Sequence, residues 1–202
     1  MRGVSITKRA FRAGPIQARL FRHGSLFERI ARRGSRTIVV NDPIDQLERS
    51  HRRLEEACDA LSIAASEHDI DTANNVCAFF ARQVRRHEED EEQSLFPRLE
   101  PLATPELRAV LERLSSEHRE HDALRKKLDD AISGRSEGPD DMWTELSRIA
   151  DRLGRAYRSH IDEEEKHLFP AARTLLSPAI LEEMRAEMDA RRGHARGVGI
   201  AG

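Results

Sequence analysis

Residues 87–97, HEEDEEQSLFP, return 73 residues later in altered form as residues 160–170, HIDEEEKHLFP. In each copy, the histidine that opens the stretch precedes a glutamate by four residues, so the two side chains share one face of a helix. The apolar positions that flank these pairs at core spacing are Val84, Leu95, Tyr157 and Leu168. The repeat therefore predicts two helices that each present a histidine and a glutamate to a common interior.

Helix start signals and apolar periodicity predict two further long helices. Asp42 with Pro43, and Thr104 with Pro105, have the pattern of an N-cap residue followed by a first-turn proline. We expect helices over 43–65, 72–96, 105–132 and 141–169. The short connections between them favour antiparallel neighbours, so the predicted fold is an all-α, up-down-up-down four-helix bundle.

The two ends of the chain differ from this bundle. Ser177 and Pro178 open a short fifth helix, which Gly193 closes, and a flexible tail is expected over 194–202. Residues 1–40 hold ten Arg and Lys and one acidic residue, whereas residues 41–202 hold 24 basic and 35 acidic residues. We expect this basic arm to be mostly disordered. It fits a tether to nucleic acid or an anionic surface, an Arg-rich targeting peptide, or an extension without function.

Composition excludes several classes of protein. The chain has 202 residues and only 4% aromatic residues, which argues against an all-β fold. It has neither a membrane-length apolar run nor a secretory signal, so we expect a soluble, cytoplasmic protein. Two cysteines, Cys58 and Cys77, are too few for a disulfide scaffold, and we expect both to be buried, reduced thiols.

The other two long helices each bring one histidine to the interior. His51 and His118 interrupt apolar series that match one another at an offset of 67 residues. The bundle core would then contain four imidazoles and two carboxylates, and buried carboxylates need a compensating charge. A pair of metal ions supplies that charge, and a set of imidazole and carboxylate ligands suits iron, manganese or zinc.

The order of these motifs resembles the hemerythrin-like family, also called the HHE cation-binding domain, over about residues 42–170. That family has a lone His, an HxxxE, a second lone His and a second HxxxE on four helices. The resemblance implies a non-heme di-iron centre in which Glu91 and Glu164 bridge the ions. The implied metal ligands are His51, His87, Glu91, His118, His160 and Glu164. The oxygen-carrying members instead have HxxxH on the third helix and HxxxxD on the fourth.

The function expected from this resemblance is the binding or sensing of O2, NO or peroxide at the iron site. An enzyme that decomposes peroxide or reduces nitric oxide is an alternative, and so is an iron donor for the repair of iron-sulfur clusters. We expect no membrane partner, and a nucleic-acid partner only through the basic arm.

Some residues allow more than one interpretation. A ferritin-like site would use the ExxH pairs Glu48 with His51 and Glu164 with His167, but it leaves the repeat unexplained. His121 is either a fifth imidazole ligand or a hydrogen-bond partner of a ligand. Tyr157 is expected mainly to pack in the core. We expect the remaining histidines to be solvated or satisfied structurally; they are His23, His68 and His194.

Overall fold

The computed structural model describes residues 42–134 and 141–193, and within these ranges the protein is all-α and has no strand. The helical segments are α2 (Pro43–Glu67), α3 (Ile70–Phe79), η2 (Phe80–Val84), α4 (Arg85–Asp90), η3 (Glu91–Leu95), α5 (Phe96–Leu99), η4 (Glu100–Leu102), α6 (Pro105–Ile132), α7 (Met142–Glu163), η5 (Glu164–Leu168), α8 (Phe169–Leu175) and α9 (Pro178–Arg191). The expected basic arm and C-terminal tail lie outside the described residues.

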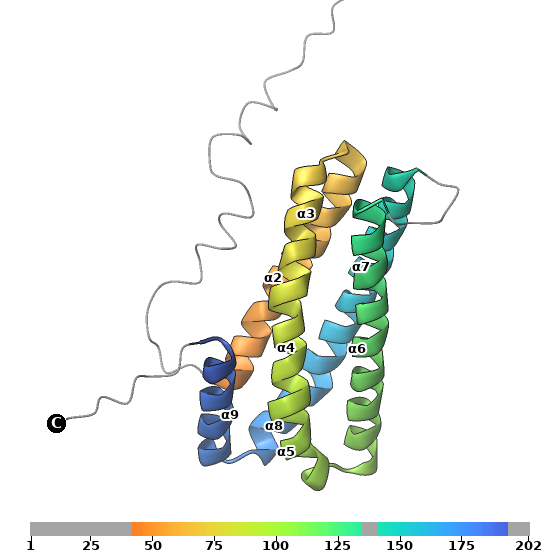
Figure 1. Ribbon diagram of the computed structural model, residues 1–202. Helices are drawn as coiled ribbons and strands as arrows, with labels where there is room; N and C mark the ends of the chain where they lie inside the picture. Colours follow the sequence, from red (N-terminus) through yellow and green to blue (C-terminus); the bar gives the residue numbers. More distant parts are fainter. Residues whose placement is uncertain (1–41, 135–140, 194–202) are drawn as a thin grey trace, which may run out of the picture. The chain divides into compact units, whose positions relative to one another are not determined.

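Successive segments join into long rods, as Figure 1 shows for α3 to α5 and for α7 to α8. Helix α2 packs against α3 and α7, and α6 packs against the same two helices on the other side of the interior. Helix α9 packs against α2 and η3. These neighbours enclose one interior, which can therefore receive side chains from all the long rods. In the part of the chain that the structure describes, no helix is both long enough and apolar enough to cross a membrane.

The predicted starts of the first and third long helices are confirmed by their caps. Asp42 Oδ1 accepts a hydrogen bond from the backbone N–H of Ile44 at 2.8 Å, and Thr104 caps α6 in the same way. The second helix begins at Ile70 rather than at residue 72, so this predicted boundary was wrong. His68 takes a left-handed conformation, with φ of 58°, and the Asp69 side chain caps α3. The chain therefore reverses within two residues.

The predicted ends of the second and fourth helices were also wrong, because both helices continue past their prolines, to Leu99 and to Leu175. A proline lacks an N–H group and its ring clashes with the carbonyl group four residues before it. In both places a π-helical turn, η3 or η5, ends two residues before the proline and takes up this mismatch. The turns occupy equivalent positions of the repeat, and each begins at a glutamate of an HxxxE pair.

The bundle interior has apolar layers on both sides of a polar layer. On α2, Leu47 and Leu54 are buried on either side of His51, and on α6 Leu114 and Leu124 flank His118. The apolar layer at the end of the bundle near α9 includes Met184 and Met188 of α9 itself. The fifth helix is thus part of the core.

The substitution Met184→Ala should destabilise the protein by about 2–5 kcal/mol, because Met184 is completely buried in this layer. The control Ile63→Ala, at a side chain that is 52% exposed, should change the free energy of unfolding by less than about 0.5 kcal/mol. Urea unfolding monitored by circular dichroism measures both. Equal effects of the two substitutions would show that α9 does not contribute to the core.

Candidate metal centre

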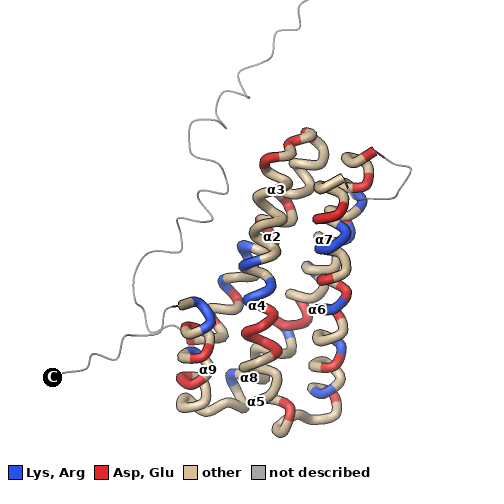
Figure 2. Tube along the Cα trace, in the orientation of Figure 1, with Lys and Arg blue, Asp and Glu red and all other residues tan. Residues whose placement is uncertain are grey.

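Six side chains that the sequence predicts as ligands lie in the polar layer at mid-height of the bundle. They are His51 on α2, His87 on α4, Glu91 at the start of η3, His118 on α6, His160 on α7 and Glu164 at the start of η5. None is more than 5% exposed, and both glutamates are completely buried. The acid-rich turn from α4 into η3 is visible in Figure 2 as a red stretch of the tube.

These side chains form two clusters with ligand geometry, and the clusters overlap. One contains His51 and His87, the other contains His118 and His160, and both contain Glu91 and Glu164. Within each cluster, one donor atom from each residue lies within 4.8 Å of all the others. Each cluster therefore offers two imidazoles and two carboxylate oxygens to one ion, and the carboxylates are common to both.

Glu164 spans the two clusters with its two oxygens. Its Oε2 lies 3.0 Å from Nε2 of His51 in one cluster, and its Oε1 lies 3.1 Å from Nε2 of His160 in the other. A metal ion about 2.1 Å from each ligand atom has neighbouring ligands about 3 Å apart when they stand at right angles. The separations fit a carboxylate that gives one oxygen to each of two ions.

Glu91 has the same arrangement from the opposite side. Its Oε1 lies 3.2 Å from Nε2 of His87, and its Oε2 lies 3.4 Å from Nε2 of His118. Within the second cluster, the Nε2 atoms of His118 and His160 are 3.1 Å apart. Such a close approach of two ring nitrogens needs either a proton or a cation between them.

In each of the four imidazoles, Nδ1 is the nitrogen that faces away from the clusters, and its contact fixes the tautomer of the ring. The Nδ1 contacts are His51 to Glu165 at 3.0 Å, His87 to Ser50 at 2.7 Å, His118 to Glu92 at 2.9 Å and His160 to Glu117 at 2.7 Å. A carboxylate only accepts, and the Ser50 hydroxyl already donates to the carbonyl oxygen of Leu47. Each Nδ1–H therefore donates outward, so each ring directs Nε2 into the centre, where its lone pair is free to bind a metal ion once the proton on Nε2 is lost.

Several of the inward atoms have no hydrogen-bond partner. All four carboxylate oxygens of Glu91 and Glu164 are buried without a hydrogen bond, as are the Nε2 atoms of His51 and His87, and the neighbours of these oxygens are the ring nitrogens of the clusters. Unpaired buried carboxylates are costly, whereas a divalent or trivalent cation satisfies them all. The side chains present therefore fit a metal site on the chemistry of their donor atoms.

The family comparison agrees with this geometry. The model of the hemerythrin HHE cation-binding domain matches residues 42–172, which contain all six side chains, and matches again over residues 119–199. The chain belongs to the hemerythrin HHE cation-binding domain family. An uncharacterized protein of Haemophilus influenzae is 29% identical over an alignment of 164 residues, gaps included; the alignment covers 75% of this chain and 91% of that protein. No solved structure matches the chain.

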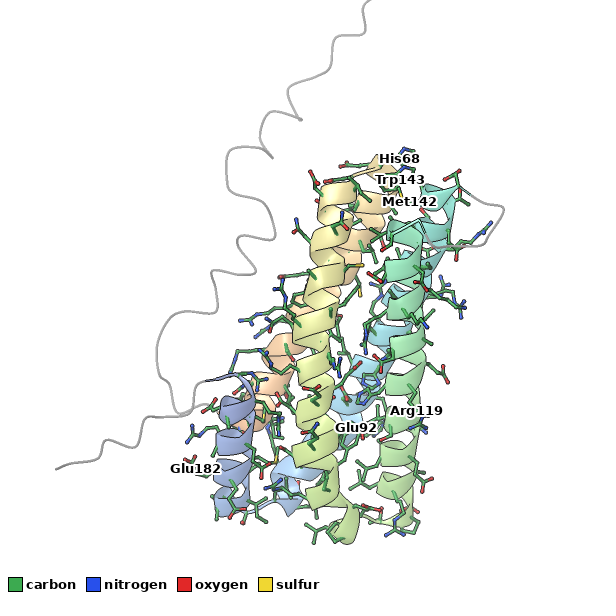
Figure 3. All side chains as sticks on the ribbon, viewed as in Figure 1. His68, Glu92, Arg119, Met142, Trp143 and Glu182 are labelled. Carbon is green, nitrogen blue, oxygen red and sulfur yellow. The ribbon has the colours of Figure 1, made fainter. Side chains whose placement is uncertain are left out.

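Membership of the hemerythrin family and the His/Glu clusters together indicate metal-ion binding. The structure does not bring together the residues that a ferritin-like site would need. Glu48 lies on the surface, where its Oε1 accepts from Arg173 at 2.8 Å, and His167 is exposed. His68 stacks on Trp143 at the far end of the bundle, with ring centroids 4.8 Å apart (Figure 3). His23 and His194 lie outside the described residues.

His121 and Tyr157 lie beside the two clusters without joining either of them. The His121 ring is buried 4.3 Å from the Tyr157 ring and 5.0 Å from the His160 ring. Tyr157 also stacks on Phe80, and its hydroxyl oxygen accepts from the Arg125 guanidinium. Tyr157 is therefore a packing residue, and its hydroxyl is directed away from the ligands.

The cysteines are free and take no part in the clusters. Cys58 is buried as expected, and burial raises the pKa of its thiol to about 12. Cys77 is only partly buried, so this expectation was wrong for the second cysteine. Burial still raises its pKa to about 11, which keeps the thiol protonated at neutral pH.

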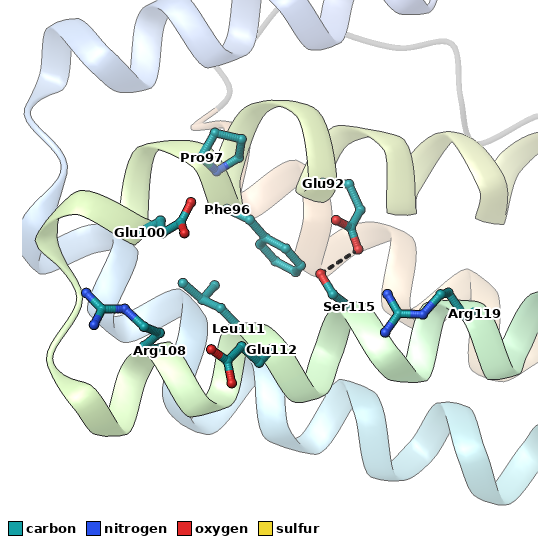
Figure 4. Close-up of a pocket in the computed structure, with 9 residues that line it drawn as sticks. All are labelled: Glu92, Phe96, Pro97, Glu100, Arg108, Leu111, Glu112, Ser115 and Arg119. Carbon is teal, nitrogen blue, oxygen red and sulfur yellow. Dashed lines mark hydrogen bonds between the residues drawn. The ribbon is translucent and has the colours of Figure 1, made fainter.

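Sequence reasoning missed the residues that hold the outer nitrogens. Glu92 and Glu165 directly follow the two repeat glutamates, so they obey the offset of 73, and Ser50 and Glu117 directly precede histidines related by the offset of 67. The two offsets could therefore have identified these four residues from the sequence. Glu92 also accepts from the Ser115 hydroxyl at 2.9 Å beside a surface pocket between η3 and α6 (Figure 4).

Glu117→Gln should weaken metal binding by about 10- to 100-fold, because an amide holds the His160 tautomer less firmly than a carboxylate. Glu120→Gln, at an exposed position on the same helix, is the matched control. Competition titration against a chromophoric chelator gives both affinities. Equal affinities for the two variants would exclude a role for Glu117 in orienting His160.

The apo centre should lose stability as pH rises above neutrality. Burial lowers the pKa of His160, but Glu164 and Glu117 outweigh it and raise this pKa to about 11. Carboxylates likewise outweigh burial at His51 and His118 and raise each pKa to about 9. An unfolded imidazole titrates near 6.5, so the folded chain binds more protons above that pH.

The stabilisation from these three imidazoles is fully present below about pH 6.5 and is lost as pH rises through about 9 and about 11. The urea midpoint of the metal-free protein should therefore fall between about pH 7 and about pH 9. The metal-loaded protein should show a weaker dependence, because its imidazoles bind metal in place of protons. A flat profile for the metal-free protein would contradict this assignment.

Proposed function

We propose that the two clusters hold a pair of non-heme iron ions and that the protein binds or senses O2, NO or peroxide there. The observation that carries the proposal is the sharing of Glu91 and Glu164 between the clusters. Each cluster supplies two imidazole nitrogens and two carboxylate oxygens. Four protein ligands leave positions for a small ligand if the ion is five- or six-coordinate.

The donor set supports iron. It contains nitrogen and oxygen and no thiolate, which suits iron, manganese or zinc and argues against a cysteine-based zinc or iron-sulfur site. Membership of the hemerythrin family favours iron among these metals. Manganese and zinc remain the alternatives that elemental analysis separates. We further propose that the long rods form the up-down-up-down bundle expected from the sequence.

The side chains of this protein prepare the centre for a small apolar or weakly polar ligand. The four outward Nδ1 contacts keep the imidazoles neutral and oriented, and the two glutamates balance the charge of the ions. Bound iron would supply an exchangeable coordination position and an electron source or acceptor. Leu54, Leu95 and Leu168 are buried in the adjoining layers and limit the access of water.

Binding or sensing is favoured over turnover by the surroundings of the centre. Proton-coupled turnover needs a donor directed at the bound ligand. The Tyr157 hydroxyl instead contacts Arg125, and Nδ1 of His121 lies 3.9 Å from Glu88. We therefore place the peroxide- or NO-converting enzyme, and the iron donor, second to a binding protein.

His87→Ala combined with His160→Ala should abolish binding of two metal ions, because it removes one imidazole from each cluster. The protein would be purified from iron-fed cells and examined by elemental analysis, circular dichroism and absorption spectroscopy before and after exposure to O2, NO and H2O2. The native chain should contain about two irons. The reagent that changes the spectrum identifies the ligand.

The matched control is His68→Ala with His167→Ala, because both of these histidines are exposed. The control should retain its metal, and both double variants should retain their helix content. Full metal retention by the His87 and His160 double variant would disprove the ligand assignment. A native protein with one zinc and no iron would disprove the di-iron proposal.

A further inference from the structure

The contact that holds His87 differs from the other three outer contacts. His51, His118 and His160 each donate to a carboxylate, and those carboxylate side chains are 47%, 39% and 28% exposed, respectively. His87 donates to Ser50, which is neutral. Three of the four outer contacts therefore end at a negatively charged side chain on the surface, and the contact of His87 with Ser50 does not.

Arginines lie on both helical segments near the contact of Ser50 with His87. Arg49 directly precedes Ser50, and Arg53 lies one helical turn further along α2. Arg86 directly precedes His87, and Arg82 lies one turn before it. The hydrogen bond of 2.7 Å between Ser50 and His87 joins the two elements at this level, and α2 runs opposite to the α3–α5 rod (Figure 1).

We call Arg49, Arg53, Arg82 and Arg86 the arginine surface. Figure 2 shows blue stretches on α2 and on the segment that leads into α4. None of the four forms an ion pair with another described residue, whereas Arg85 pairs with Glu89 and Arg125 pairs with Glu88. Arginines left unpaired in a chain this rich in acids are available to an anionic partner.

The charge pattern favours an acidic protein over nucleic acid. Residues 41–202 contain 24 basic and 35 acidic residues, so the arginine surface is a local positive area on an acidic body. A long polyanion that extends beyond the arginine surface meets that negative charge, whereas a compact acidic surface can match four arginines alone. The carboxylates of Glu92, Glu117 and Glu165 would repel the same partner, which leaves the surface near Ser50 as the place for contact.

The position of the arginine surface adds a reason for the contact. Ser50 is half-buried and His87 is 4% exposed, so one hydrogen bond leads from the surface to a proposed metal ligand. We propose that the arginine surface docks an acidic electron-carrier protein, which delivers electrons to the metal pair through Ser50 and His87. This inference rests on the proposed iron pair for the transfer, but not for the docking.

Each transfer moves one electron and no atom. The reduced cofactor of the carrier loses one electron, and one iron(III) of the pair becomes iron(II). The step as written transfers no proton, and the Ser50 hydroxyl and the His87 N–H already have hydrogen-bond acceptors.

The test uses the full chain and, as the probe, a plant-type [2Fe–2S] ferredoxin with an acidic surface. Stopped-flow spectroscopy records the oxidation of reduced ferredoxin by the iron(III) protein at low ionic strength. The variant Arg49→Glu, Arg53→Glu, Arg86→Glu should slow this reaction by about tenfold or more and remove most of its salt dependence. Substitution of the same three residues by Gln should give a smaller change in the same direction.

The control variant carries an equal charge change at exposed positions elsewhere, Arg108→Glu, Arg152→Glu and Arg155→Glu. It should react with ferredoxin several-fold faster than the Arg49, Arg53 and Arg86 variant. Reduction by a neutral hydroquinone should be the same in all variants, because it does not depend on docking. Equal rates with ferredoxin for the two charge-reversal variants would overturn the proposal.

Two further measurements separate docking from the metal function and from nucleic-acid binding. Calorimetry with oxidised ferredoxin and the metal-free chain measures docking alone, so it tests the arginine surface even if the iron pair is not found. Titration with a short DNA duplex measures the other class of partner. A loss of DNA binding without a loss of ferredoxin binding in the arginine variant would assign the surface to nucleic acid and overturn the proposal.

Discussion

The convergence of unpaired lone pairs at mid-bundle is the constraint on which the rest of the structure depends. Four carboxylate oxygens and the inner nitrogens of four imidazoles share a space from which solvent is excluded. Without a cation, protons must balance the buried charge: Glu164 and Glu117 raise the pKa of His160 to about 11 despite burial, and burial with the charge of Glu164 raises the pKa of Glu91 to about 8. The protein core is therefore complete in chemical terms only with an added positive charge.

A closed ring of hydrogen bonds between the rods orients the four imidazoles and thus their lone pairs. Each histidine donates to a residue of another helical rod: α2 to η5, α7 to α6, α6 to η3, and α4 to α2. The ring passes through every long rod, so a displacement of one rod changes the orientation of two imidazoles. Helix packing and ligand orientation are in this way the same property, and the hydrogen bonds add directional precision to a core whose apolar contacts are not directional.

The sequence predicts those parts of the structure that depend on local rules. Proline after a capping residue marked α2 and α6, and an HxxxE pair at helical spacing marked one face of the α3–α5 rod and one face of the α7–α8 rod. The helix ends near Pro97 and Pro170 were missed because a π-helical turn is decided by the surroundings of the turn, and no local residue pattern specifies it. The outer contacts were missed because the acids of a run such as HEEDEE also suit a solvated helix face, and only the offsets of 73 and 67 residues distinguish those that meet a histidine from another rod.

The π-helical turn η3 also gives the fifth helix a role at the centre. Asp90 precedes Glu91, is completely buried, and accepts hydrogen bonds from Arg191 and Arg192 at the end of α9. A buried carboxylate held by two guanidinium groups is fixed in position on the outer side of the turn, while Glu91 faces inward. Since a π-helical turn is intrinsically less favourable than an α-helical one, an external anchor of this kind stabilises the conformation that presents Glu91 to both clusters.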